Sequence, residues 1–121
     1  MRRVLTFFFE TTEVAAAGES ERVPKQFVLS QNYPNPFNPT TILSFGLPVR
    51  SWVQVEIYNL IGQRVRNWPA SLLDAGFHEQ QWDGLNDAGL PVSSGEYFLR
   101  VSAESTGGEK LVRTVRMSLV R

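Results

Sequence analysis

The chain of 121 residues has room for one ordinary domain, and its 42% hydrophobic, 20% charged and 12% aromatic content is that of a globular protein rather than a disordered one. Twelve basic and twelve acidic side chains cancel to a formal net charge of zero, which argues against a nucleic-acid partner. Because the chain has no cysteine, it has no disulfide scaffold, no thiolate zinc site and no cysteine nucleophile.

Residues 1–26 have the composition of a stub followed by a linker. A basic start precedes an apolar run at residues 4–9, and an alanine triplet that resembles a cleavage site follows. Glu10 and Glu13 interrupt this pattern, and the run of about six residues is shorter than the roughly 7–15 of a signal peptide. We expect a degenerate start, an edge strand or a linker remnant here. No run in the chain reaches the roughly 18 apolar residues of a membrane-spanning helix.

Residues 27–121 alternate between short strands and turns and form the expected domain. Apolar and polar side chains alternate with the period of two that a half-buried strand has. Prolines end two of the runs, and one helical turn is expected over residues 70–75. Strands are expected over residues 43–47, 53–57, 63–68, 77–82, 96–103 and 110–120. About seven short strands with no sustained helical period predict an all-β, immunoglobulin-like antiparallel β-sandwich.

Turn residues separate these strands. Asn59–Gly62 is expected to form one tight turn and Gly107–Gly108 another. A larger turn follows Trp82, whose indole is large enough to fill the centre of a small sandwich. Asp83 is expected to accept hydrogen bonds from turn amides, and a positive φ is expected at four glycines: Gly62, Gly84, Gly89 and Gly95.

Residues 31–40 contain three prolines within six positions, which fix φ and remove backbone donors. We expect a stiff, polyproline-like crossing, with Tyr33 and Phe37 as its anchors at one end of the sandwich. Two interpretations remain open: a preorganised recognition surface and a structural plug.

The last strand, residues 110–121, carries four cations among apolar residues. Such charges protect an edge strand against edge-to-edge pairing. They also suit an accessible strand that a partner binds by strand addition. The two roles are compatible.

Chemistry-bearing residues are few. Asp83, Asn86 and Asp87 are spaced 0, 3, 4, which differs from the 0, 2, 4 spacing of an EF-hand loop, so no metal and no cofactor are predicted. His78 is the single histidine and has the pattern of a half-buried structural residue. No nucleophile or phosphate-binding motif is present, and we do not expect an enzyme. Trp52 and Trp68 lie at strand ends, where they could either stack on sugar rings or close the core at the edge of a sheet.

Several blocks of the sequence together resemble a known family. They are Leu29–Thr41, Val55–Val65, Ala75–His78, Trp82–Gly84, Ser94–Phe98 and Val115–Leu119. In this order they resemble the type A C-terminal sorting domain of the type IX (Por) secretion system, a family similar in fold to the immunoglobulin-like domain of flagellar hook-capping proteins. The resemblance covers residues 27–121. Arg116 and Gln80 depart from it, since a lysine and an apolar residue are usual at these positions.

The resemblance implies a non-catalytic sorting signal that directs an attached, N-terminal cargo protein through the periplasm to the cell surface or exterior. The implied partners are the outer-membrane machinery and a sortase-like peptidase, and the domain is expected to be a monomer without a membrane span. The expected structural motif residues are Gly62, Trp82, Asp83, Gly84, Gly89, Gly95 and Tyr97. The candidate contact residues are Asn32, Tyr33, Pro34, Asn35, Pro36, Phe37, Asn38, Pro39, Lys110, Arg113, Arg116 and Met117. The alternative function is an adhesive or carbohydrate-binding accessory module of a surface protein.

Overall fold

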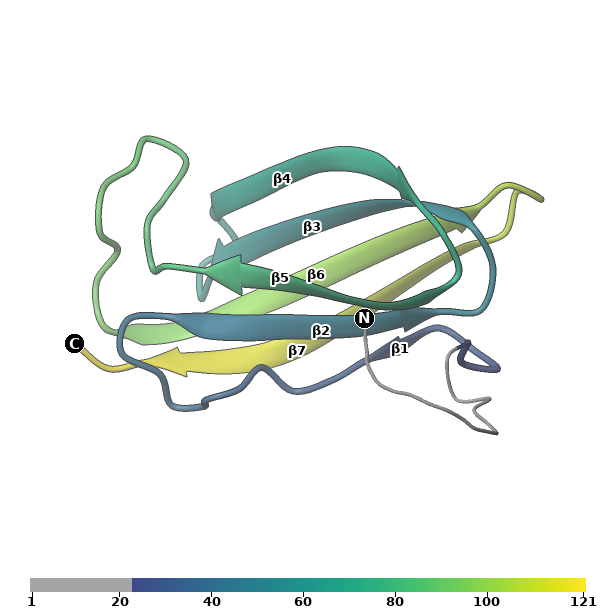
Figure 1. Cartoon of the computed structure of the whole chain (residues 1–121). Coiled ribbons are helices and arrows are strands. Elements are labelled where there is room, and N and C mark those ends of the chain that lie inside the picture. The colour runs from purple at the N-terminus through teal and green to yellow at the C-terminus, as the bar shows by residue number, and fades with distance from the viewer. Residues whose placement is uncertain (1–22) are drawn as a thin grey trace.

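The structure is a computed structural model that describes residues 23–121. The signal-like pattern at the N-terminus lies outside the described residues, and the domain boundary at residue 27 stays a prediction. Two antiparallel sheets face one another, one with the order β1-β2-β5 and one with the order β4-β3-β6-β7 (Figure 1). The strands are β1 (Val28–Leu29), β2 (Thr41–Leu47), β3 (Ser51–Asn59), β4 (Arg64–Leu73), β5 (Gly76–Trp82), β6 (Gly95–Ser105) and β7 (Lys110–Leu119). The predicted all-β, immunoglobulin-like sandwich of about seven strands is confirmed.

The period-two pattern places the strands as expected. In β6, Tyr97, Leu99, Val101 and Ala103 are buried, while the residues between them face outward. Successive side chains of a strand point to opposite faces, so this alternation turns one face of the four-stranded sheet toward the core. Among residues 23–121 there is no helix, and hence none that could cross a membrane.

Trp82 lies at the centre of the core, as predicted, and is fully buried. Its ring lies 5.6 Å from the rings of both Phe37 and Tyr97, in tilted and edge-on geometry. Such offset aromatic pairs are favourable beyond the area they bury. The indole Nε1 donates to the carbonyl of Leu85 at 2.9 Å, so the polar end of the side chain is satisfied as well.

Strand β4 is longer than predicted. We expected it to end before Pro69 and a helical turn to follow, and both expectations are wrong, since the strand continues to Leu73. The register shifts between Val53 and Val55 of β3, whose partners are Ser71 and Trp68, and Pro69 lies in this bulge. A proline is tolerated there because β4 is an edge strand and the bulge interrupts the hydrogen-bond ladder.

Several loops meet at one end of the sandwich. The turn before β2, the long loop between β5 and β6 and the C-terminal end lie together on the left of Figure 1. Each predicted positive φ is present, at Gly62, Gly84, Gly89 and Gly95. This end of the molecule holds most of the residues that the sequence singled out.

Candidate recognition surface

The proline-rich segment, residues 31–40, crosses from one sheet to the other. Tyr33 pairs with Ile42 of β2 through backbone hydrogen bonds of 3.1 and 2.9 Å. Four residues later, Phe37 forms a parallel bridge with Leu119 of β7. The predicted crossing is therefore present, but the expected polyproline-like path was wrong, because the segment bends at residues 34–36 and again at residues 38–39.

Asn32 anchors the start of the segment. Its side chain is buried and donates to the carbonyl of Pro34 at 3.1 Å and to the hydroxyl of Thr41 at 2.9 Å. The Thr41 hydroxyl donates in turn to the Pro34 carbonyl at 2.9 Å, and Gln31 donates to the Asn32 side-chain oxygen at 2.6 Å. Proline supplies no backbone donor, so side chains hold this bend in place.

Phe37 anchors the second half of the segment in the core, as predicted, and packs on Trp82. The same expectation for Tyr33 was wrong, because 79% of its surface is exposed. The reason is local: the segment is strand-like at this point, and with Asn32 turned inward the next side chain points outward. Tyr33 is thus a large aromatic group held in solvent on a fixed backbone.

The proline-rich segment also covers the end of β7. The Phe37 amide donates to the Ser118 carbonyl at 2.9 Å, and the Val120 amide donates to the Phe37 carbonyl at the same distance. The Ser118 amide donates to Asn35 Oδ1 at 3.0 Å, and Gln31 Nε2 donates to the Arg116 carbonyl at 2.7 Å. The last part of β7 is therefore paired, so only its first part fits the expected accessible strand.

A charge-assisted network joins β6 to β7 beside this segment. The Ser118 hydroxyl donates to one carboxylate oxygen of Glu96 at 2.6 Å, and Arg116 Nε donates to the other at 2.9 Å. These bonds lower the pKa of Glu96 below its ordinary value of 4.5, the Ser118 bond more than the Arg116 bond.

The loop between β5 and β6 closes the end of the sandwich. Asp83 accepts from the Leu85 amide at 3.1 Å, as predicted for a turn, and lies 3.4 Å from Arg66. Asp87 accepts from the Asn67 amide of β4 at 2.9 Å. Both carboxylates therefore accept backbone hydrogen bonds and pair with Arg66. No cluster of three acidic or histidine side chains that could hold a metal occurs among residues 23–121.

Arg121 is hydrogen-bonded to this loop, and the loop packs against the proline-rich segment at Gly84. Arg121 donates from Nε to the Val92 carbonyl at 2.6 Å and from Nη2 to the Gly84 carbonyl at 2.8 Å. Gly84 has φ +77°, and a Cβ there would meet Arg121 Nη2 at 2.9 Å and the Pro39 carbonyl oxygen at 3.1 Å. A glycine is required by both its conformation and this close approach.

The candidate contact residues divide by exposure. Three are buried and shape the surface from beneath: Asn32, Phe37 and Met117. The others are exposed: Tyr33, Pro34, Asn35, Pro36, Asn38, Pro39, Lys110, Arg113 and Arg116. We define the end surface as the exposed members of residues 33–39 together with Arg116. The bonds that Gln31, Ser118 and Arg121 make here were not predicted from the sequence, because their partners lie far away along the chain.

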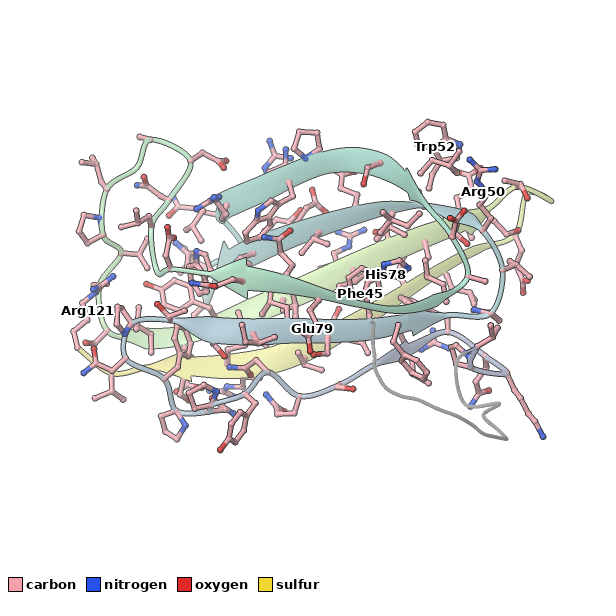
Figure 2. The ribbon with its side chains drawn as sticks, viewed as in Figure 1. Phe45, Arg50, Trp52, His78, Glu79 and Arg121 are labelled. Carbon is pink, nitrogen blue, oxygen red and sulfur yellow. The ribbon has the colours of Figure 1, made fainter. Side chains whose placement is uncertain are left out.

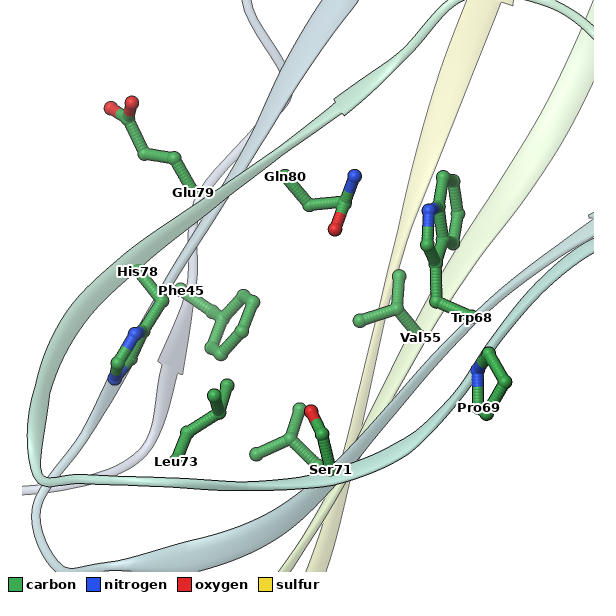
Figure 3. Close-up of a pocket in the computed structure, with 10 residues that line it drawn as sticks. Phe45, Val55, Trp68, Pro69, Ser71, Leu73, His78, Glu79 and Gln80 are labelled. Atoms are coloured by element: carbon green, nitrogen blue, oxygen red, sulfur yellow. The ribbon is translucent and has the colours of Figure 1, made fainter.

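The tryptophans proposed as sugar platforms differ from each other. Trp52 is 51% exposed and lies at the opposite end of the molecule from Arg121 (Figure 2). Trp68 packs against the core, and the guanidinium of Arg66 lies 4.7 Å from its ring centroid. Its ring borders a cavity of about 170 Å³ between β4 and β5, into which Gln80 also points (Figure 3). His78 stacks on Phe45 at the rim of this cavity and is half-buried, as predicted.

Comparison with known proteins identifies the family. The model of the FlgD immunoglobulin-like domain matches residues 36–107. The chain belongs to the FlgD immunoglobulin-like domain family. The predicted relation to the domain of flagellar hook-capping proteins is thereby confirmed. A search of curated proteins found no match.

Solved structures share the fold. Dimeric latent PorU from Porphyromonas gingivalis superposes with a TM-score of 0.65 at 22% identity, over 78% of this chain and 9% of PorU. FlgD from P. aeruginosa gives 0.55 at 21% identity, over 76% of this chain and 73% of FlgD. FlgD from Xanthomonas campestris, described as a hook-capping protein of flagellar assembly, superposes with a TM-score of 0.55 at 22% identity. The match covers 77% of this chain and 67% of that FlgD chain. The chain thus corresponds to a small part of PorU and to most of each FlgD chain.

Proposed function

We propose that this chain is a non-catalytic sorting domain, which directs an attached cargo protein through the type IX secretion machinery to the cell surface or exterior. The sequence resemblance over residues 27–121 supports this role, and so does the immunoglobulin-like fold that the chain shares with PorU. A folded-domain signal is recognised by shape, so it needs a surface whose groups are fixed before the partner arrives.

The observation that carries the proposal is the pairing of the proline-rich segment with β7. Backbone bonds of 2.9 Å join Phe37 to both Ser118 and Val120, so the segment most specific to the resemblance is fixed on the final strand. Tyr33 and Asn38 are exposed on this framework. In our proposal the outer-membrane machinery binds this end surface, and a sortase-like peptidase acts on the chain before residue 27.

An export assay tests the proposal. A periplasm-directed fluorescent reporter is fused in front of the full chain and expressed in a bacterium that has a type IX secretion system. We expect the fusion to reach the surface or medium while the reporter alone stays in the periplasm. Retention of both in the periplasm would exclude the sorting role.

The exposure of Trp52 favours one alternative, a carbohydrate-binding accessory module. This alternative predicts that the purified chain binds a glycan on an array and that Trp52→Ala abolishes the signal, because an exposed indole face stacks on sugar rings. Trp68→Ala is the matched variant, since Arg66 covers its ring. Glycan binding lost only in Trp52→Ala, combined with failure of export, would replace the sorting role by this one.

A further inference from the structure

An apolar patch lies on the outer face of the four-stranded sheet, where β3 and β6 run side by side (Figure 1). Tyr58 of β3 and Phe98 of β6 are opposite one another in register, and both are half-buried. They point away from the core, because their neighbours Ile57 and Leu99 are fully buried on the inner face. Two aromatic residues are thus cross-strand neighbours on a face that no other strand of the described chain covers.

The turn between β3 and β4 adds two aliphatic side chains to this patch. Leu60 and Ile61 are 58% and 78% exposed. The turn is rigid, because Asn59 Oδ1 accepts from the amides of Ile61 at 3.1 Å and Gln63 at 2.9 Å. The turn therefore holds both aliphatic side chains in solvent, and its backbone does not have to be ordered on binding.

A shallow hollow of about 230 Å³ lies in the middle of the patch. It is large enough for one apolar side chain of a partner. The residues that line it come from β3, the following turn, β6 and β7, and are Tyr58, Asn59, Leu60, Gly62, Phe98, Arg100 and Thr114.

Arg100 gives the hollow a positive charge. Glu56, opposite Arg100 in register, is held by Arg64 at 3.2 Å, and Arg116 is held by Glu96 at 2.9 Å. No ion pair with Arg100 occurs among residues 23–121. This part of the sheet thus has three guanidinium groups and two carboxylates. The two carboxylates pair with Arg64 and Arg116, so the excess positive charge is on Arg100, which lines the hollow.

We propose that this patch, the β3–β6 patch (Tyr58, Leu60, Ile61, Phe98 and Arg100), binds an extended segment of another protein that carries an apolar side chain beside a carboxylate. Tyrosine, phenylalanine and arginine are the residues enriched at the centres of protein interfaces. The apolar side chain enters the hollow, and the carboxylate pairs with the guanidinium of Arg100. The proposal does not rest on the sorting role, because it is argued from the residues of the patch alone. The patch borders the end surface at Arg116, which is opposite Phe98 in register and whose guanidinium lies 6.0 Å from the centroid of that ring.

A second copy of the chain fits this patch less well. Two copies that met face to face through a two-fold axis would place the same residues against each other. The guanidinium of Arg100, which has no ion-pair partner within residues 23–121, would then approach its own copy, and like charges across an interface are unfavourable.

Peptide titration of the full chain, followed by amide chemical shifts, tests the inference. The probe is the acetylated and amidated peptide Gly-Asp-Phe-Asp-Gly, and its matched counterpart is Gly-Lys-Phe-Lys-Gly. We expect saturable shifts at Tyr58, Phe98, Arg100 and Thr114 with the acidic peptide. The lysine peptide should bind about tenfold more weakly or worse, since it lacks the carboxylates that pair with arginine.

Two arginine variants show whether the preference for the acidic peptide comes from Arg100 itself or from the net charge of the protein. Arg100→Gln should reduce the affinity ratio of the two peptides to about one, because it removes the cation in the hollow. Arg113→Gln is the control: it removes the same charge from β7, but its guanidinium lies against Phe27 at 5.7 Å, away from the patch. Equal binding of both peptides, shifts confined to other residues, or shifts that depend on protein concentration alone would each overturn the inference, the last in favour of self-association.

Discussion

At the scale of single residues, a few polar side chains fix the loops around Trp82. Asn32 is a buried amide that bonds to Pro34 and Thr41, and it replaces the backbone donors that proline lacks. A buried polar group left without its partner is costly, so this amide is more important for the bend than its small size suggests.

Asn32→Ala should therefore destabilise the chain by about 1–3 kcal/mol, because the Thr41 hydroxyl and the Pro34 carbonyl lose a buried partner. Urea unfolding measures the change. Asn38→Ala is the control, since Asn38 is exposed and should change the free energy of unfolding by less than about 0.5 kcal/mol. Equal stability of the two variants would contradict the anchoring role of Asn32.

Two glycines of the loop after β5 allow backbone strain to be separated from crowding. Gly84 and Gly89 have similar φ, +77° and +80°, but only Gly84 has atoms within 4 Å of the position that a Cβ would take. Gly89→Ala should cost about 1 kcal/mol from its conformation alone. Gly84→Ala should cost about 1–3 kcal/mol more, because its methyl group meets the rigid Pro39 carbonyl. Urea unfolding measures both changes. A smaller loss of unfolding free energy for Gly84→Ala than for Gly89→Ala would show that the β5–β6 loop does not pack against the proline-rich segment.

At the scale of elements, the proline-rich segment acts as a cover for β7. An uncovered edge strand is a template for pairing with other chains. The Ser118 amide, which would otherwise face solvent, donates to Asn35 Oδ1 at 3.0 Å. The other edge of the same sheet is treated similarly, since the Asn67 amide of β4 donates to Asp87. Each edge is thus capped by a side chain from a loop.

Asn35→Ala should open the cover at one position. Loss of one hydrogen bond of about 1 kcal/mol corresponds to roughly fivefold faster hydrogen exchange at the Ser118 amide. The Val120 amide, bonded to the Phe37 carbonyl, should be affected less and is the internal control. Unchanged exchange at Ser118 would refute the capping role of Asn35.

The link between β6 and β7 should make stability depend on pH. Because the native pKa of Glu96 lies below 4.5, its bonds to Ser118 and Arg116 stabilise the fold above that pH, and the contribution is lost as the pH falls through the native pKa. Glu96→Gln should melt at a lower temperature than the parent chain near pH 7, and the difference should shrink as the pH is lowered below 4.5 through the native pKa of Glu96. A difference in melting temperature that does not change with pH would contradict this link.

The sequence predicts the strands of this sandwich better than it predicts the loops. The alternation in β3 and β6 is local, so the buried faces follow from the pattern alone. The extension of β4 through Pro69 depends on a bulge against β3, which no local pattern records. The outward position of Tyr33 likewise follows from the inward anchor at Asn32 in a bent segment without periodicity.

The candidate recognition surface was predictable only in part, because its contacts are long-range. Residues 31–40 were singled out by their prolines, but Asn35 contacts Ser118 across 83 positions and Gln31 contacts Arg116 across 85. Packing of the sheets, rather than any local preference, brings these groups together. The burial of Met117 was predictable from its place in the strand, and this burial excludes its side chain from the surface.

At the scale of the whole molecule, we assign different roles to the two ends of the sandwich. Tyr33 is exposed on the end surface, and Trp52 is exposed at the opposite end (Figure 2). Both are large aromatic side chains whose removal leaves the core intact. If the secretion machinery recognises the end surface, substitution of Tyr33 should impair export and substitution of Trp52 should not, while neither should impair folding.

Export of the reporter fusion with Tyr33→Ser and with Trp52→Ser is the most direct test of this claim. We predict that Tyr33→Ser lowers the exported fraction about tenfold, the effect expected for an aromatic anchor of an interface, while Trp52→Ser exports like the parent chain. Both variants should melt within about 2 °C of the parent, since exposed substitutions change stability little. Normal export of Tyr33→Ser, with the reporter alone still retained, would contradict the proposed role of the end surface.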